Sequence, residues 1–324
     1  MTESPAIAQG VVAIFVTMNR CEIARTCLQK LSAQSLRPEQ VIVVNNASTD
    51  QTRQMLATAS HDSGGWIVIR ELDENLGNAG GMQIALECIF ADDFKAAWIL
   101  DDDSWPEPEA LQRLLAADVP AHAVRSCRVV DLVTGALSWP LQVPDRGNWH
   151  LLEAMDSIPE GDVIRIRRSW LGALIPRSVY LAVGPVEGRL FLRGEDEDYP
   201  RRIEQAGIPV FMVASSLLHH PSPDHLHRLE FAGCPVILES GLSSDKLYYR
   251  LRNLWWITRR DRGLFAAAFS VLLHGFALAR WENSIKSWLP VWCEAARDAF
   301  RNRLGPRNPR PTSNEASEKS SQIP

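Results

Sequence analysis

The sequence predicts an α/β protein with a doubly wound, mostly parallel sheet and a helical C-terminal region. Two observations support this fold class. Short apolar runs alternate with stretches of helical periodicity through the first third of the chain, which is typical of parallel strands joined by right-handed crossovers. The composition then changes after about residue 240, where paired aromatic residues and arginines follow an amphipathic pattern.

The individual elements follow from these patterns. Continuous apolar runs predict strands that are buried on both faces, because such strands lack polar alternation. Residues 121–170 contain short runs separated by Pro and Gly, which predicts less regular, partly antiparallel structure. In chain order we expect strand 11–16, helix 21–33, strand 41–44, helix 51–59, strand 66–69, helix 79–90, strand 96–100, an apolar segment 171–176, helices 178–183 and 195–206, strand 210–213, and helices 245–260 and 264–279.

Three consecutive carboxylates, Asp101, Asp102 and Asp103, follow the apolar run 96–100. They should stand at the carboxyl end of a strand, where open α/β sheets bind ligands. Adjacent like charges are tolerated best beside a cation, and carboxylate oxygens suit Mg²⁺ or Mn²⁺. The alternative is a solvated turn in which Asp103 or Ser104 caps a helix near residues 106–117.

A glycine-rich segment, residues 75–81, opens a helix directly after a strand. Glycine lets backbone amides approach a ligand, and a helix N-terminus favours an anion, although an ordinary tight turn would explain the same residues. In a parallel sheet this loop and the one carrying Asp101 rise at the same edge. A diphosphate on the glycine side would then meet a metal on the aspartate side.

A second acidic cluster, residues 195–198, stands at another loop-to-helix junction. The helix dipole stabilises acids in a first turn, so the cluster has a structural explanation, but one of these acids could also act as a general base. His219 and His220 end a further strand. A neutral imidazole could complete a coordination shell begun by carboxylates, or the pair could be ordinary surface residues.

Taken in order, these segments resemble the family 2 glycosyltransferases of the GT-A fold over roughly residues 10–260. Within that family the chain looks closest to the rhamnosyltransferase and galactofuranosyltransferase branch, through the Asp triplet, residues 194–202 and the Tyr-Tyr-x-x-Arg-Asn segment. The motifs that carry the resemblance are Val-Thr-Met-Asn-Arg (16–20), Val-Asn-Asn-Ala-Ser-Thr-Asp (44–50), Asn-Leu-Gly-Asn-Ala-Gly-Gly (75–81), Leu-Asp-Asp-Asp (100–103), Gly-Glu-Asp-Glu-Asp-Tyr-Pro-Arg-Arg (194–202), Leu-His-His-Pro (218–221) and Tyr-Tyr-Arg-Leu-Arg-Asn (248–253).

The resemblance implies an inverting glycosyltransferase that depends on Mn²⁺ or Mg²⁺. It would move a sugar, with galactofuranose or rhamnose favoured, from a UDP- or dTDP-sugar to a hydroxyl of a glycan or lipid-linked acceptor. Two other functions remain open: a nucleotidyltransferase that forms the sugar nucleotide, and a noncatalytic glycan- or membrane-binding scaffold. The segment 17–20 offers little of the basic glycine-rich loop that a nucleotidyltransferase needs, and intact acidic motifs argue against a scaffold.

The resemblance also assigns roles to individual residues. Asp196 would be the catalytic base, Trp170 and Asp198 would contact the acceptor, and Asp103 would be the principal metal ligand with Asp101 and His220. Many relatives have Asp-Asn where this chain has Asn45-Asn46, although Asn45 can still bond a pyrimidine edge. The residues expected to bind the donor are Thr17, Asn19, Arg20, Asn45, Asn75, Gly77, Gly80, Gly81, Asp101, Asp102 and Glu195.

Three parts of the chain are expected: a catalytic domain (1–240), a helical region (241–304) and a disordered tail (305–324). The net charge of −5 argues against a general nucleic-acid-binding protein. Residues 250–310 are nevertheless strongly basic, which predicts a basic C-terminal face. The apolar segment 264–279 is short for a membrane span, so an interfacial helix and a core helix are both open. Peripheral membrane contact and self-association are compatible with this pattern.

The cysteines and the N-terminal residues favour a cytosolic setting. Six cysteines are scattered without a paired motif, so a reduced compartment is expected, and zinc or thiol chemistry is not. Residues 1–10 lack the pattern of a secretory signal. The expected location is the cytoplasm, including the cytoplasmic face of the inner membrane.

Overall fold

The computed structural model describes residues 6–152, 161–223, 225–231, 234–282 and 284–307. Its strands are β1 (Ala6–Thr17), β2 (Leu36–Asn45), β3 (Ile67–Glu71), β4 (Ala96–Ile99), β5 (Trp105–Pro106), β6 (Val124–Val130), β7 (Leu141–Asp145), β8 (Asn148–Leu152), β9 (Val163–Ile166), β10 (Ala173–Pro176), β11 (Val210–His219), β12 (Leu226–Phe231) and β13 (Cys234–Glu239). The helices are α1 (Cys21–Ser32), α2 (Thr52–Asp62), α3 (Gly77–Ala91), α4 (Ala110–Ala116), α5 (Arg177–Val183), α6 (Glu195–Gln205), α7 (Ser244–Arg262), α8 (Leu264–Trp281) and α9 (Ile285–Phe300), with a 3-10 turn at Gly188–Leu190.

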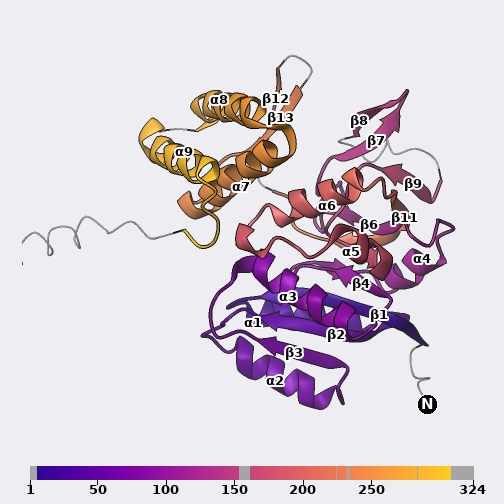
Figure 1. Cartoon of the computed structure of the whole chain (residues 1–324). Helices are drawn as coiled ribbons and strands as arrows, with labels where there is room; N and C mark the ends of the chain where they lie inside the picture. The colour runs from indigo at the N-terminus through magenta and orange to yellow at the C-terminus, as the bar shows by residue number, and fades with distance from the viewer. Residues whose placement is uncertain (1–5, 153–160, 224, 232–233, 283, 308–324) are drawn as a thin grey trace, which may run out of the picture.

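A nine-stranded sheet runs through the first two thirds of the chain (Figure 1). Its order is β3-β2-β1-β4-β10-β6-β11-β5, and β9 pairs with the other end of β11. The pairs β1–β2, β1–β4, β2–β3 and β6–β11 are parallel, whereas β10 is antiparallel to both β4 and β6. Because β10 is antiparallel to both of its neighbours, β4 and β6 run in the same direction. Strand β11 is parallel to β6, so β4, β6 and β11 all end at the same edge of the sheet.

Helices cover both faces of this sheet, as a doubly wound fold requires. On one face, α3, α5 and α6 pack against alternate residues of β1, such as Ile14, and of β2. On the other face, α1, α2 and α4 pack against the intervening residues, such as Phe15 of β1 and Trp98 of β4. All three of these side chains are fully buried, which explains why the corresponding runs are continuously apolar. The predicted fold class is therefore confirmed.

The C-terminal helices form a third apolar core of their own. Helix α7 packs against both α8 and α9, around buried side chains that include Trp255, Leu278 and Trp288. The small sheets β12–β13 and β7–β8 flank this unit and the central sheet (Figure 1). The helical C-terminal region is thus confirmed, and α9, which the sequence pattern did not predict, completes it.

Two local expectations need adjustment. The helix expected near 106–117 begins at Ala110, because Trp105 and Pro106 pair with the end of β11 as β5. Neither Asp103 nor Ser104 caps it, since the residue at its N-cap position is Glu109. The hydroxyl of Ser104 instead bonds the backbone of Asp101 and closes the acidic turn.

The predicted tail 305–324 starts with residues that are held in place. Gly305 donates a backbone hydrogen bond to Arg189, and Arg307 forms ion pairs with Glu294 of α9 and Asp245 of α7. Residues 308–324 lie outside the described part of the chain. The ordered C-terminal region therefore extends at least to Arg307.

Candidate active site

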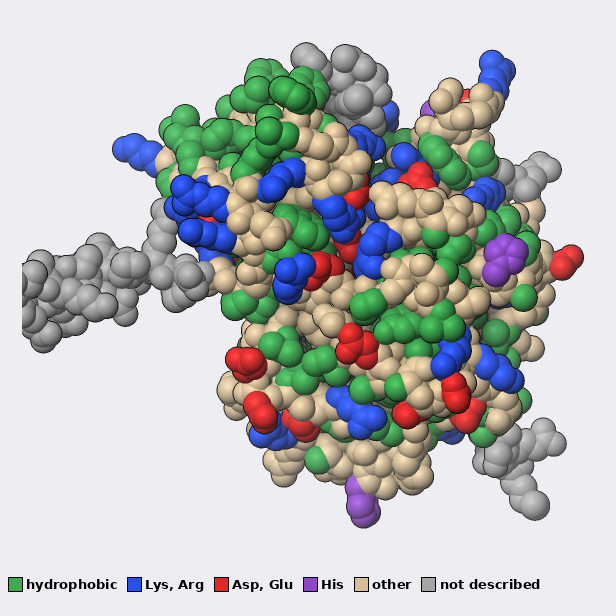
Figure 2. Space-filling model, in the orientation of Figure 1, with side chains coloured by type: hydrophobic (Ala, Val, Ile, Leu, Met, Phe, Trp, Pro, Cys, Tyr) green, Lys and Arg blue, Asp and Glu red, His purple; other side chains and the backbone are tan. Residues whose placement is uncertain are grey.

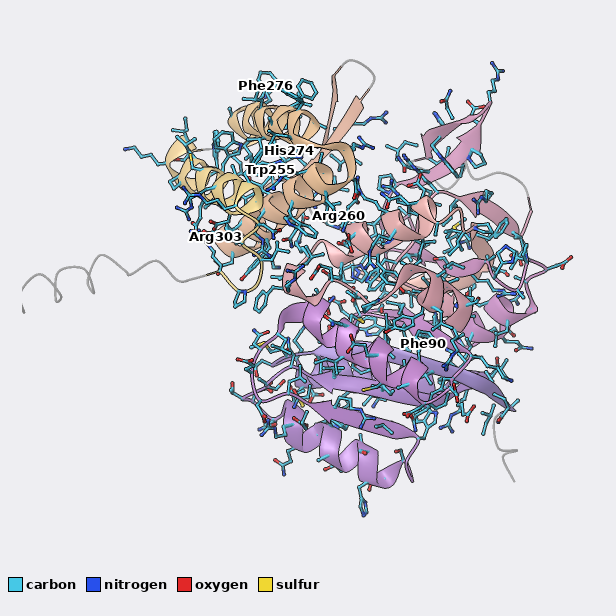
Figure 3. All side chains as sticks on the ribbon, viewed as in Figure 1. Phe90, Trp255, Arg260, His274, Phe276 and Arg303 are labelled. Atoms are coloured by element: carbon cyan, nitrogen blue, oxygen red, sulfur yellow. The ribbon has the colours of Figure 1, made fainter. Side chains whose placement is uncertain are left out.

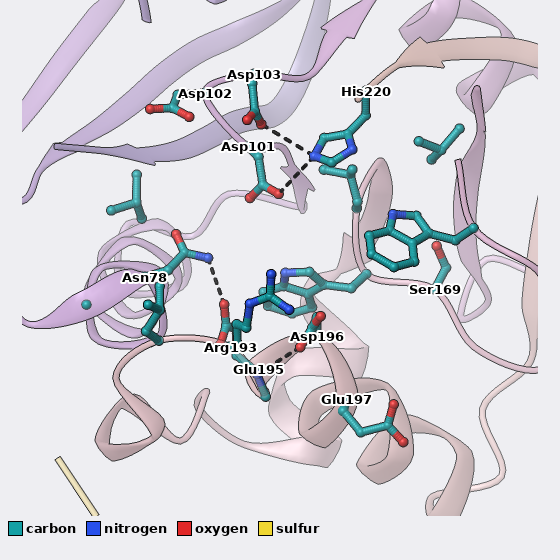
Figure 4. Close-up of a pocket in the computed structure, with 18 of the residues that line it drawn as sticks. Asn78, Asp101, Asp102, Asp103, Ser169, Arg193, Glu195, Asp196, Glu197 and His220 are labelled. Atoms are coloured by element: carbon teal, nitrogen blue, oxygen red, sulfur yellow. Dashed lines mark hydrogen bonds and ion pairs between the residues drawn. The ribbon is translucent and has the colours of Figure 1, made fainter. Parts of the chain in front are cut away.

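A cavity of about 760 Å³ opens at the carboxyl edge of the central sheet. The loops after β1, β4 and β11 form one side, and the loop leading into α6 together with α7 forms the other. Figure 4 shows the acids after β4 and those of α6 facing the same space from opposite sides. The cavity therefore brings together segments that lie far apart in the sequence.

The metal ligands predicted from the sequence meet at one wall of the cavity. His220 Nε2 lies 3.4 Å from Asp103 Oδ1 and 4.0 Å from Asp101 Oδ2. Sheet register produces this arrangement, because the backbone N–H of His220 donates to Val130 at the end of β6. His219 points elsewhere and pairs with Glu107 at 2.7 Å. Of the two histidines, only His220 belongs to the cluster.

Asp102 turns away from that cluster and is buried beneath Arg20. Its carboxylate accepts hydrogen bonds from the Thr17 hydroxyl at 2.7 Å and from Arg20 Nη1 at 2.5 Å. The same guanidinium donates to Asp103 Oδ2 at 2.8 Å. Thr17 and Asp102 thus fix the orientation of Arg20 at the rim of the acidic turn, which gives Asp102 a role that its sequence position did not reveal.

The close acids perturb one another. Burial and the charge of Asp103 raise the pKa of Asp101 to about 7, and burial raises that of Asp102 to about 6 despite Arg20. Burial also opposes ionisation of Asp103, but hydrogen bonds from His220 and Arg20 hold the pKa of that carboxyl below its usual range. The pKa of His220 is raised, since its contacts with Asp103 and Asp101 outweigh burial. A positive charge beside residues 101–103 would therefore stabilise the ionised forms of these carboxylates.

The cluster has the donor set of a divalent cation site. The candidate ligand atoms of Asp101, Asp103 and His220 all lie within 4.8 Å of one another. Two carboxylates and an imidazole suit Mg²⁺ or Mn²⁺ with open positions for substrate oxygens. The buried Nδ1 of His220 makes no hydrogen bond to the described residues. The residues present fit such a metal.

The glycine-rich segment borders the cavity at its first residues. The Asn75 side chain accepts hydrogen bonds from the Asn46 amide at 2.9 Å and from the Gly77 backbone N–H at 2.8 Å. Gly77 has φ +71°, and a Cβ there would lie 2.0 Å from the carbonyl oxygen of Phe191. Only glycine therefore allows α3 to begin against the loop that leads into α6.

Four residues predicted to bind the donor do not line the cavity. Gly80 and Gly81 let α3 pack closely on Leu76 and on Val16 of β1. The Asn19 side chain accepts from the backbone N–H groups of Thr49 and Asp50 and so ties two loops together. Asn45 is fully buried and bonds Glu71, while its neighbour Asn46 faces the cavity. In this structure packing and loop closure use these four residues, and donor binding by them stays a prediction.

Glu195 and Asp196 form the wall opposite the metal ligands. Glu195 Oε1 accepts a hydrogen bond from Asn78 of α3 at 2.7 Å, whereas its buried Oε2 has no partner among the described residues. Asp196 Oδ1 accepts from the backbone N–H of Gly194 at 2.9 Å, and its side chain remains exposed to the cavity. Each acid therefore has one anchored oxygen, but only Asp196 is exposed to the cavity, whereas the second oxygen of Glu195 is buried.

Both of these acids hold their protons more tightly than usual. Burial and the charge of Asp196 raise the pKa of Glu195 to about 8. Water reaches Asp196 through the cavity, but protein surrounds its carboxyl group on most sides, so desolvation and the charge of Glu197 raise its pKa. A neutral Glu195 can donate a hydrogen bond to a ligand hydroxyl, and a more basic Asp196 is better suited to accept a proton.

The two predicted acceptor contacts differ in outcome. Trp170 lines the cavity and packs edge-on against Tyr199, with ring centroids 5.5 Å apart. Asp198 is fully buried and does not reach the cavity, because it pairs with Arg202 at 3.0 Å and with Arg260 of α7. It lies two residues after Asp196 on α6 and therefore faces another side of the helix. In this structure Asp198 joins α6 to α7, and its contact with an acceptor stays a prediction.

Several cavity residues were not predicted from the sequence. Arg193 and Arg250 reach the cavity together, and both pair with Glu239 of β13, at 2.7 and 3.6 Å. Arginines next to the acidic motif and within segment 248–253 were a signal in the sequence, but a helix pattern does not show which of its residues turn inward. Other polar or aromatic lining residues without a predicted individual role include Asn46, Asn78, Trp139, Arg168 and Ser169.

The chain matches known proteins at the level of sequence. Residues 12–145 match the family model described as glycosyl transferase family 2. The galactofuranosyltransferase GlfT1 of Mycolicibacterium smegmatis is 28% identical over 222 residues, covering 65% of this chain and 70% of that protein. GlfT1 of Mycobacterium tuberculosis is 24% identical over 221 residues, covering 66% and 71%.

Solved structures resemble the fold at low sequence identity. A structure of GalNAc-T7 with UDP, GalNAc and Mn²⁺ matches with a TM-score of 0.56 at 12% identity, covering 80% of this chain and 48% of the other. This chain therefore spans about half the length of that protein. S. aureus TarS 1-349 in complex with UDP matches with a TM-score of 0.52 at 14% identity, covering 96% and 92%.

The solved structures show that the fold is of the GT-A type. The family model and the galactofuranosyltransferase relatives indicate a glycosyltransferase. More narrowly, residues 12–145 form a family 2 glycosyltransferase domain, and the chain is related to the galactofuranosyltransferases. The family resemblance predicted from the sequence motifs is confirmed.

Proposed function

We propose that this chain is an inverting, divalent-metal-dependent glycosyltransferase. Residues 1–240 would form its catalytic domain and residues 241–304 its helical region. It moves galactofuranose, or alternatively rhamnose, from a UDP- or dTDP-sugar to a hydroxyl of a glycan or lipid-linked acceptor. One observation carries the proposal: the cavity has the set Asp101, Asp103 and His220 on one wall and the accessible carboxylate of Asp196 on the other. The names of the related galactofuranosyltransferases support the choice of sugar.

In this proposal Asp103, Asp101 and His220 hold Mn²⁺ or Mg²⁺. A bound divalent cation supplies Lewis-acid stabilisation of the negative charge on the departing diphosphate. Arg20 pairs with Asp102 and with Oδ2 of Asp103 at the rim of the cavity and adds a fixed positive charge there. Thr17 and Asp102 keep this guanidinium in place, so the charge needs little reorganisation during transfer.

The donor occupies the space between the β4 loop and the start of α3. Asn75, Gly77 and Glu195 line the cavity, and the buried Oε2 of Glu195 has no hydrogen-bond partner among the described residues. Because burial keeps Glu195 neutral near pH 7, its carboxyl group can donate a hydrogen bond to a sugar hydroxyl. Asn78 holds the other oxygen and sets the direction of that bond.

Asp196 is the catalytic base. Its carboxylate takes the proton of the acceptor hydroxyl as that oxygen attacks the anomeric carbon from the face opposite the diphosphate. The C1–O bond to the diphosphate breaks as the new C1–O bond forms, so the anomeric configuration inverts and the enzyme forms no covalent intermediate. Trp170 supplies an apolar wall for the acceptor beside Ser169. We place this activity in the cytoplasm.

Stereochemistry tests this proposal directly. The full chain is incubated with Mn²⁺, an octyl glycoside acceptor and, in separate reactions, UDP-galactofuranose, UDP-galactose, UDP-glucose and dTDP-rhamnose, and the products are analysed by proton NMR. We expect transfer from UDP-galactofuranose or dTDP-rhamnose, with an anomeric configuration opposite to that of the donor. Retained configuration, or equal activity without any divalent metal, would overturn the assignment.

A further inference from the structure

Helix α8 carries a stripe of large apolar side chains on its outer face. Phe265, Phe269, Leu272 and Phe276 are 91, 46, 67 and 62% exposed. Their spacing of four, three and four residues places them along one side of the helix. Figure 2 shows apolar side chains gathered over α8, at the end of the molecule distant from the central sheet. We call these four residues the α8 stripe.

The opposite face of α8 is buried in the C-terminal core. Val271, His274 and Ala277 point toward α7 and α9, and the imidazole of His274 lies edge-on to Trp255 at 6.1 Å. Figure 3 shows His274 directed at Trp255 while Phe276 points outward. The inner face of α8 is therefore packed against the C-terminal core, and its outer face is apolar and exposed to solvent.

A one-sided helix fits a membrane surface better than a membrane crossing. Among the described residues, α8 is the helix with the length and composition to cross a bilayer. Crossing would pull His274 and its neighbours out of their contacts with α7 and α9. Lying flat in the headgroup layer buries the α8 stripe and leaves the C-terminal core intact.

Basic residues stand at both ends of the stripe. Arg262 precedes α8, Arg280 lies in its last turn, and Lys286 opens α9. All three side chains are exposed, and none forms an ion pair with another residue in the described ranges. An anionic lipid surface would supply the missing negative charge beside the apolar stripe.

The same charges disfavour a second copy of the chain as the occupant. If two α8 helices paired through their stripes, Arg262 and Arg280 of one copy would meet basic residues of the other in either orientation. Like charges brought together in this way oppose association. A single helical stripe also offers much less than the roughly 800 Å² per partner of a standard stable interface.

We propose that the α8 stripe inserts into the headgroup layer of an anionic lipid bilayer, with Arg262, Arg280 and Lys286 contacting lipid phosphates. The membrane holds the enzyme with α8 flat on its surface. This inference rests on the helix alone and does not depend on the sugar that the cavity transfers.

Flotation of the full chain with vesicles of equal parts phosphatidylcholine and phosphatidylglycerol tests the proposal. The triple variant Phe265→Ser, Leu272→Ser, Phe276→Ser should lower the vesicle partition coefficient by at least about tenfold, because it removes inserted apolar area. Leu181→Ser is the matched control, since Leu181 on α5 is 67% exposed but lies outside the stripe, and its partitioning should equal that of the wild type.

Charge reversal and oligomeric state complete the test. Arg262→Glu with Arg280→Glu should abolish the preference for phosphatidylglycerol over pure phosphatidylcholine vesicles while leaving the helical content, measured by circular dichroism, unchanged. Wild-type partitioning of either variant would overturn the proposal. So would light scattering that shows a wild-type dimer converted to a monomer by the stripe variant, because the stripe would then be a protein interface.

Discussion

The side-chain amide of Asn253, on α7, donates a hydrogen bond to the backbone carbonyl of Arg193 at 2.5 Å. The same amide bonds the carbonyls of Leu190 and Leu192 at 3.0 and 3.2 Å. Gly194, with φ +97°, passes directly against the Asn253 side chain. A buried residue of the C-terminal region therefore shapes the loop that delivers Glu195 and Asp196 to the cavity.

Replacing Asn253 should damage both stability and activity. Asn253→Ala removes the donor to the part-buried carbonyl groups of Leu192 and Arg193, so we expect a loss of about 2 kcal/mol in the free energy of unfolding. The loop can then move, so kcat should fall more than donor affinity does. Urea denaturation and steady-state kinetics measure the two effects. The exposed Asn148→Ala serves as control and should change neither; a fully active Asn253→Ala would show that the loop keeps its shape without α7.

The two adjacent histidines provide a matched pair for the metal site. His220→Ala removes a ligand atom from the cluster, whereas His219→Ala removes only a contact with Glu107. We expect Mn²⁺ affinity, measured by calorimetry, to drop about 10- to 100-fold for His220→Ala and to stay near the wild-type value for His219→Ala. Equal effects of the two changes would mean that the imidazole of His220 does not bind the ion.

The protonation state of Glu195 makes a separate prediction. Because its carboxyl pKa is raised to about 8, the neutral form predominates at pH 7. Glu195→Gln has the shape and charge of that form and keeps an acceptor for Asn78, so the donor KM should change by less than about fivefold. Glu195→Ala loses both hydrogen bonds, and its KM should rise by at least about tenfold. A Gln variant as weak as the Ala variant would indicate that Glu195 works as an anion.

The pH dependence of transfer should reflect Asp196. Its pKa is raised by burial and by the charge of Glu197, so the base loses activity as pH falls through a value above the ordinary aspartate pKa of about 4. Glu197→Gln removes the second cause and should move the acidic limb of the profile of kcat against pH to lower pH. Rates measured across the acidic range with each enzyme decide this point. An unchanged limb would assign the titration to another group.

The parallel half of the sheet was predictable because its strands are continuous apolar runs. Val41–Val44 and Ala96–Leu100 could hardly be anything but buried strands, and the acids that follow the second run had to lie at the ligand-binding edge. The proximity of His220 to those acids could not be predicted from local sequence patterns. The position of His220 depends on the insertion of β10 as an antiparallel strand between β4 and β6. No local sequence pattern predicts this insertion.

Residues whose side chains are used for packing were predicted least well. Gly80 and Gly81 belong to a glycine-rich pattern typical of anion-binding loops. In the structure the lack of a side chain at these positions leaves room for Leu76 and Val16. Asp198 shares an acidic run with Asp196, but the helix turns it toward Arg260. Arg250 is the opposite case, since only the packing of α7 against β13 brings it to the cavity. Tertiary contacts decide such positions.

The variant Asp196→Asn separates donor binding from removal of the acceptor proton. Donor binding in the presence of Mn²⁺ is measured by calorimetry and single-turnover transfer by rapid quench, with the wild-type chain as the reference. We expect donor affinity within about threefold of wild type and transfer slowed about 10²- to 10⁴-fold, because only the proton acceptor is lost. Transfer by Asp196→Asn at the wild-type rate would contradict the account.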